Sequence, residues 1–118
     1  MYELTAEVTA EFIGTAILIL LGNGVVANVL LTDTKGNGGG LIVICTGWGL
    51  AVYTAVLCVG DISGAHINPA VTIGLAVAGE FPWSSVSGFV VAQMAGAIVG
   101  GAIVYLFYKS HYDVTEDA

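Results

Sequence analysis

The polar residues with the clearest chemistry in this sequence stand at the start of a short apolar run. Asn68 and Pro69 begin a stretch that stays mostly apolar as far as Gly79. An asparagine side chain accepts a backbone N–H in the first turn of a helix, and proline fits the first helical position because its missing N–H costs nothing there. The pair therefore predicts a helix that begins at Asn68, with positive potential at that end. Such an end, with a free amide NH2, repels cations and can donate a hydrogen bond to a neutral polar solute.

The residues immediately before this helix predict a row of backbone acceptors. Pro69 disfavours the α region at Asn68, and glycine loosens the chain at Gly64, so we expect an extended backbone here. Carbonyl oxygens along an extended strip can accept hydrogen bonds from water or from hydroxyl groups. The carbonyls expected to do so belong to Gly64, Ala65, His66 and Ile67.

Acid–base and metal chemistry have little support in the sequence. His66 has no nucleophile or paired carboxylate near it except Asp61, so we expect a hydrogen-bonded or pore-lining histidine rather than a catalytic one. Cys45 and Cys58 lie in an apolar run without metal-ligand spacing, and we expect two unpaired thiols. The sequence therefore predicts no enzyme, no bound metal and no cofactor.

The elements that must position these residues are membrane helices. The chain has 118 residues, of which 57% are hydrophobic and 9% charged, so it is far more apolar than a soluble domain of this size. Three apolar runs reach the length of about 20 residues that spans a bilayer, at about 8–31, 41–60 and 86–108. Lys35 and Lys109 are the only cations, which excludes a nucleic-acid surface. We predict an all-α membrane protein embedded in the lipid bilayer.

The run over 68–79 has a different role from the three spans. Its residues, rising about 1.5 Å each, cover roughly half the hydrocarbon core, so it predicts a re-entrant half-helix that starts near the midplane. Irregular backbone at that depth is tolerated only where protein covers it or it lines a wet cavity. In the third span, Ala92, Gly96 and Gly100 share one face and are expected to let two helices pack closely.

The motifs at these places resemble a known family. Residues 63–74, SGAHINPAVTIG, resemble the first NPA box of the major intrinsic proteins, the aquaporins and glycerol facilitators. Three further matches follow the family's order: AEF-x-G at 10–14, Trp-Gly at 48–49 and QMAGA at 93–97. The resemblance covers the chain from about residue 5 to 108.

This resemblance implies a channel of six spans and two half-helices, in which residues 1–118 form the first inverted repeat. The family's second NPA and the arginine after it have no counterpart here, and the sequence contains no arginine. We therefore expect a fragment of a longer channel or a half-length product that requires the second half. The resemblance also implies a homotetramer when the channel is complete. It places the N-terminus inside the cell, although Lys35 and Lys109 would favour the opposite orientation by the positive-inside rule.

The resemblance also assigns roles to single residues. The sequence alone is equally compatible with a lipid-facing or interfacial Trp48, but the resemblance places it at the outer constriction, where the glycerol branch usually has tryptophan and water-selective members usually have phenylalanine. Val52 lies one turn further along the same helix face. Glu11 would brace the strip by accepting its buried N–H groups, and Gln93 would be a second polar brace. The expected pore residues are Trp48, Val52, Gly64, Ala65, His66, Ile67, Asn68, Pro69 and Ala70.

The function expected from the sequence is passive passage of glycerol and other small neutral solutes, with water, across the cell membrane, while protons and ions are excluded. One alternative is half of a water-selective aquaporin. Another is a small dual-topology transporter or ion channel that assembles as an antiparallel homodimer. A third is a non-conducting fragment that binds partner subunits. The segment from Lys109 to Ala118 is expected to be a loose acidic linker.

Overall fold

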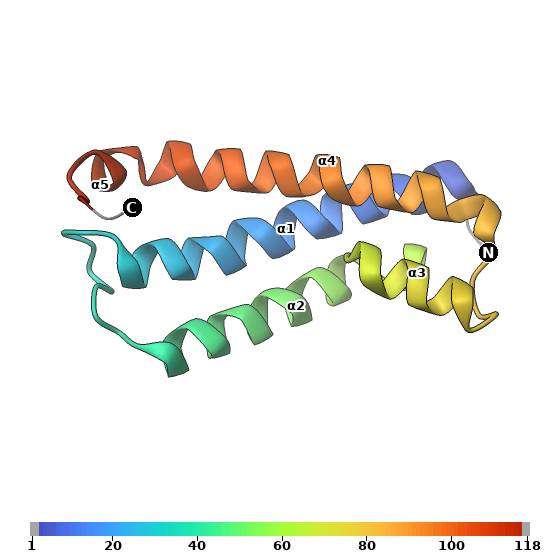
Figure 1. Cartoon of the computed structure of the whole chain (residues 1–118), viewed down its shortest axis with the longest axis horizontal. Helices are drawn as coiled ribbons and strands as arrows, with labels where there is room; N and C mark the ends of the chain where they lie inside the picture. The colour runs from blue at the N-terminus through green and yellow to red at the C-terminus, as the bar shows by residue number, and fades with distance from the viewer. Residues whose placement is uncertain (1–2, 117–118) are drawn as a thin grey trace.

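The structure is a computed structural model that describes residues 3–116. Within these residues it is all-helical, with three long helices and two short ones (Figure 1). The elements in chain order are α1 (Leu4–Leu30), α2 (Leu41–Ser63), α3 (Pro69–Val77), α4 (Trp83–Phe107) and α5 (Lys109–Asp113). The predicted helical fold with three long apolar helices and one half-length helix is confirmed.

The observed boundaries differ from the expected ones by a few residues. Helix α1 begins at Leu4, before its apolar run, and α2 continues through Asp61 to Ser63. Polar residues are accommodated at helix ends, so hydropathy alone places these boundaries too far inside. Gly64 ends α2 in the left-handed conformation, with φ +84°, as is common for a glycine after a helix.

Helix α1 is the centre of the fold. It packs along α4 on one side and along α2 on the other, and α3 packs against α4. Figure 1 shows α1 between the other two long helices, with α3 at the end of the molecule where the N-terminus lies. The strip between α2 and α3 therefore lies close to residues on α1 and α4.

Small residues on α4 allow it to approach α1 closely. A Cβ built on Gly96 would lie 2.3 Å from the carbonyl oxygen of Phe12, and one on Gly100 would lie 2.6 Å from that of Ala16. Both glycines are buried. The two backbones are thus in direct contact, a packing mode typical of membrane helices.

The outer surfaces of the long helices are apolar. Helices α1, α2 and α4 are each long and apolar enough to cross a membrane. Large side chains such as Leu57, Val91 and Ile98 are exposed on them. A surface of this kind is suited to lipid or to another membrane protein rather than to water.

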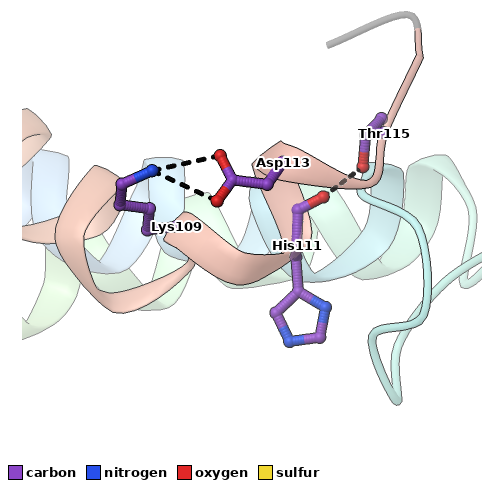
Figure 2. Close-up of polar contacts among 4 residues, drawn as sticks. All are labelled: Lys109, His111, Asp113 and Thr115. Atoms are coloured by element: carbon purple, nitrogen blue, oxygen red, sulfur yellow. Dashed lines mark hydrogen bonds and ion pairs between the residues drawn. The ribbon is translucent and has the colours of Figure 1, made fainter.

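The segment after α4 is ordered, and the prediction of a loose linker was wrong over residues 109–116. Figure 2 shows Lys109 paired with Asp113 across one turn of α5, with Nζ 3.1 Å from both carboxylate oxygens. This hydrogen bond and the carboxylate charge raise the pKa of Lys109 above its ordinary value. Residues 117 and 118 lie outside the described part of the chain.

A pair of side chains ties this segment to the loop after α1. The hydroxyl of Thr115 donates to the carbonyl of His111, as Figure 2 shows, and accepts from the backbone N–H of Thr32. The ring Nδ1 of His111 lies 3.0 Å from the Thr32 carbonyl oxygen. The acidic composition suggested a flexible segment, but these contacts with the loop after α1 hold it in place.

Candidate functional site

The predicted start of the half-helix is built from side-chain and backbone capping. Asn68 is the N-cap of α3, and its Oδ1 accepts the backbone N–H of Ala70 at 2.8 Å. Pro69 occupies the first helical position. Since Oδ1 is used as the cap, the NH2 group of the exposed Asn68 side chain makes no hydrogen bond among residues 3–116.

The backbone between α2 and α3 is extended at Asn68, as Pro69 predicts, but the expectation of an extended backbone was wrong at Ala65 and Ile67. Ala65 and Ile67 have φ angles of +50° and +46°, in the left-handed region. This region is rare for residues other than glycine and costs most for a β-branched residue. Here it turns successive N–H groups to one side, where a buried acceptor satisfies them. Successive N–H groups that converge in this way form an anion-binding concavity.

The acceptor in this concavity is the carboxylate of Glu11, which is completely buried on α1. Its Oε2 accepts the backbone N–H of His66 at 3.2 Å and the hydroxyl of Ser63 at 2.6 Å. Its Oε1 accepts the backbone N–H of Ile67 at 2.8 Å and Nε2 of Gln93 at 2.7 Å. Donors therefore satisfy both oxygens, which a buried carboxylate requires.

The N–H groups of 65–67 are all used on this side, while that of Gly64 closes the last turn of α2 on Gly60. Ser63 Oγ accepts the N–H of Ala65 at 3.1 Å, next to those that Glu11 takes from His66 and Ile67. Within residues 3–116, no hydrogen bond reaches the carbonyl oxygens of 64–67. The strip consequently has N–H groups that are all paired within the protein, and a row of carbonyl oxygens that are free to accept hydrogen bonds.

A second set of contacts extends the network to α3. Gln93 Nε2 lies 2.9 Å from the hydroxyl of Thr72, which is fully buried. That hydroxyl lies 2.8 Å from Nδ1 of His66. The His66 ring also packs against Phe81 and Phe89, with ring centroids 4.7 and 5.0 Å away. Gln93 thus joins α4 to both α1 and α3.

Sequence reasoning missed two members of this network. Thr72 was not singled out, and Ser63 appeared only inside the resembling motif. For Thr72 the available signal was a polar residue within an otherwise apolar half-helix. Its partners, His66 and Gln93, lie in other segments, so the signal did not show what the hydroxyl contacts.

The structure places Trp48 and Val52 away from the strip. Trp48 precedes Ser63 by fifteen positions of α2, or about 22 Å along a helix. The Trp48 ring packs against α1 at Gly22, where an added Cβ would lie 2.3 Å from a ring atom. Gly22 therefore makes the room that the indole occupies, while Val52 is exposed one turn further along α2.

An open pocket adjoins the strip on the side of His66. It has a volume of about 530 Å³, and its lining includes Glu7, Ser63, Gly64, His66 and Ser85. Among the described residues, no group of three or more histidine, cysteine, aspartate or glutamate side chains is placed to hold a metal ion. Most of the exposed lining is apolar, from residues such as Leu4, Ile62 and Phe81.

Comparison with known proteins agrees with the family resemblance seen in the sequence. The model of the family "Major intrinsic protein" matches residues 1–118. A probable glycerol uptake facilitator protein of Thermotoga maritima is 61% identical over 108 residues, which cover 92% of this chain and 46% of the relative. The glycerol uptake facilitator protein of Streptococcus pneumoniae is 55% identical over 112 residues, covering 95% of this chain and 48% of its own length.

A solved structure extends this likeness to the fold. The aquaglyceroporin from Plasmodium falciparum superposes with a TM-score of 0.84 at 37% identity, over 94% of this chain and 45% of that one. This chain spans about half the length of the curated relatives it matches.

Proposed function

The chain belongs to the major intrinsic protein family, and from this premise we propose that it forms one half of a passive channel for glycerol and other small neutral solutes, with water. It is an integral membrane protein with three spans, α1, α2 and α4, and α3 is its half-helix. The relatives named above are glycerol uptake facilitators, which supports glycerol as the permeant. Passage of a solute down its gradient involves no covalent step and no cofactor.

The main observation in support of this proposal is that the N–H groups of the strip are paired within the protein while its carbonyl oxygens are not. Glu11 and Ser63 take the N–H groups of 65–67, and the carbonyls of 64–67 receive no hydrogen bond from the described residues. A hydroxyl group both donates and accepts. A polyol can therefore donate to these carbonyls and accept from the NH2 group of Asn68.

Ion exclusion follows from the position of α3. Its N-terminus begins at Asn68, beside the end of the acceptor row, so a cation that leaves the carbonyls meets the positive end of a helix dipole. A neutral solute is not repelled there. On this proposal Pro69 and Ala70 contribute to the same stretch of wall as Asn68.

Trp48 fits the proposed outer constriction. Its flat apolar ring is held against Gly22 of α1, and such a face suits the CH groups of a polyol while polar groups opposite take its hydroxyls. Val52 would continue the wall below it. Water has no CH groups to pack against, so a wide apolar face at this point is less suited to a strict water channel.

The channel also requires further protein. In the described part of the chain Gly64 is exposed and Ala65 and His66 are partly exposed, so we propose that a second half closes the path and that complete channels assemble as homotetramers. The exposed apolar surfaces of the long helices fit contact with lipid and with neighbouring subunits.

The test is solute flux in proteoliposomes that contain the full-length product carrying this chain. We expect light-scattering measurements to show fast glycerol and water entry, without proton or ion current. Water flux without glycerol flux would favour the water-selective alternative. Ion-selective or coupled transport would favour the dual-topology transporter and overturn the proposal.

Asn68→Asp tests the ion barrier at the half-helix. Aspartate keeps the oxygen that caps Ala70, but it replaces the NH2 donor by a negatively charged oxygen. We expect slower glycerol entry and a measurable cation leak. The same substitution in the loop after α1, Asn37→Asp, removes only the Nδ2 hydrogen bond to the Leu31 carbonyl, at the end of the molecule opposite α3 (Figure 1), and should change neither glycerol entry nor cation leak. If Asn68→Asp behaves like the loop variant, Asn68 has no role in permeation.

A further inference from the structure

The hydroxyl of Thr72 has its hydrogen-bond partners fully determined. Thr72 is 0% exposed, so water does not compete for this group. Two polar atoms lie within hydrogen-bond distance of its Oγ1: Nε2 of Gln93 at 2.9 Å and Nδ1 of His66 at 2.8 Å. The directions of these two bonds follow from which atoms carry protons.

The Gln93 amide fixes the first direction. The amide atom near Thr72 also lies 2.7 Å from Oε1 of the Glu11 carboxylate. A carbonyl oxygen there would face a charged acceptor, so this atom is the nitrogen. One of its protons goes to Glu11 and the other to Thr72. The Thr72 oxygen is therefore an acceptor in this bond.

The single proton of the Thr72 hydroxyl fixes the second direction. Because its oxygen already accepts from Gln93, the proton goes to the other atom in reach, Nδ1 of His66. A proton on Nδ1 would leave the buried hydroxyl proton without an acceptor, at a cost that a buried group rarely bears. The neutral His66 ring therefore carries its proton on Nε2.

The Nε2 edge of the ring lies on the side of the open pocket. A Cβ built on Gly64 would be 3.8 Å from both Nε2 and Cδ2 of His66, and both residues line the pocket. Phe81 packs edge-on against the same ring, at 68°, which restricts its rotation. Among residues 3–116 no hydrogen bond is made by Nε2.

We propose that Thr72 is a positioning residue that fixes His66 as the Nε2–H tautomer and so presents a hydrogen-bond donor at the pocket end of the acceptor row. The carbonyls of 64–67 then have donors on both sides, His66 Nε2–H and the Asn68 NH2 group. A hydroxyl that enters accepts from His66 and then donates to the carbonyls. The role in permeation rests on the proposed channel function, whereas the tautomer rests only on the contacts of Thr72.

The tautomer is measured directly by ¹⁵N NMR of histidine-labelled full-length protein. The His66 signals are identified by their loss in His66→Gln. We expect Nδ1 without a proton and Nε2 with one. His111 is an internal reference of opposite type, because its Nδ1 faces the Thr32 carbonyl, which can only accept, and so carries the proton. A wild-type spectrum with the proton on His66 Nδ1 refutes the proposal without any variant.

Thr72→Val and Thr72→Ser then test whether the hydroxyl sets the tautomer. Valine removes the hydroxyl at similar shape, and we expect a mixture of His66 tautomers with unchanged His111 signals. Serine restores the hydroxyl and should restore the wild-type spectrum. A pure Nε2–H signal in Thr72→Val would show that Thr72 does not fix the ring.

Glycerol flux of the same variants separates the two proposals. We expect Thr72→Val to lower glycerol entry by about 2- to 10-fold, the effect of one well-placed hydrogen bond, and Thr72→Ser to remain near wild type. Expected spectra from a protein that never passes glycerol would leave the tautomer assignment standing and remove the channel function. Normal flux in Thr72→Val with mixed tautomers would refute the donor's role in permeation.

Discussion

Replacing Glu11 with glutamine tests whether the buried carboxylate holds the strip. The carboxylate accepts donors from Ser63, His66, Ile67 and Gln93 at distances between 2.6 and 3.2 Å. Glutamine keeps the size of the side chain but turns one oxygen into an NH2 donor. At least one of the four partners must then face a donor instead of an acceptor.

The cost depends on which side the new NH2 group occupies. On the Oε1 side it opposes both the Ile67 N–H and the Gln93 amide. On the Oε2 side the Ser63 hydroxyl can turn and accept, so only the His66 N–H is left unpaired. That cheaper arrangement costs about 1–3 kcal/mol for the unpaired N–H, and the remaining bonds lose their charge assistance. We expect a total loss of about 2–4 kcal/mol in the free energy of unfolding.

The assay combines unfolding in detergent with glycerol flux in proteoliposomes. Without its acceptor, the left-handed backbone at Ala65 and Ile67 has less to stabilise it, so we expect flux to fall by about tenfold. Glu80→Gln is the matched control, because Glu80 is exposed and carries no part of the network. Wild-type stability and flux in Glu11→Gln would refute the idea that the carboxylate shapes the strip.

Two further substitutions test the packing around the network. Gly96→Ala places a Cβ 2.3 Å from the Phe12 carbonyl oxygen, so we expect about 1–3 kcal/mol of destabilisation in thermal unfolding. Gly101→Ala, with nothing within 4 Å of its Cβ, should be neutral or stabilising, and equal losses in both variants would contradict the close α1–α4 approach. Thr15→Val removes a buried hydroxyl that has no hydrogen-bond partner among residues 3–116, so we expect the melting temperature to rise with a gain of about 1 kcal/mol. A lower melting temperature would mean that this hydroxyl is paired after all.

The parts of the fold that sequence reasoning predicted are those governed by local rules. Hydropathy over about 20 residues located the spans, and the Asn68–Pro69 pair placed the start of the half-helix at the N-cap that the structure has. Both signals lie within the segment they describe. The same holds for the glycines of α4, whose spacing indicated a close helix contact.

The parts that sequence reasoning missed depend on partners far along the chain. Local preference favoured an extended strip before Pro69, but the carboxylate of Glu11, more than 50 residues away, stabilises left-handed backbone at Ile67 instead. The contacts of Thr72 with His66 and Gln93 were missed for the same reason. No spacing within the half-helix shows which distant side chain will reach its hydroxyl.

The small residues of α4 therefore affect more than packing. Gln93 precedes Gly96 by about one turn, on the face of α4 that contacts α1 near Phe12, the neighbour of Glu11. The close approach of the two backbones lets the amide nitrogen of Gln93 reach Glu11 at 2.7 Å, and the same nitrogen lies 2.9 Å from Thr72 of α3. A Cβ at Gly96 would move α4 away from α1 and lengthen the bond from Gln93 to Glu11. The absence of a side chain at one helix contact thus helps to keep Gln93 on Glu11, the carboxylate that holds the backbone of the strip.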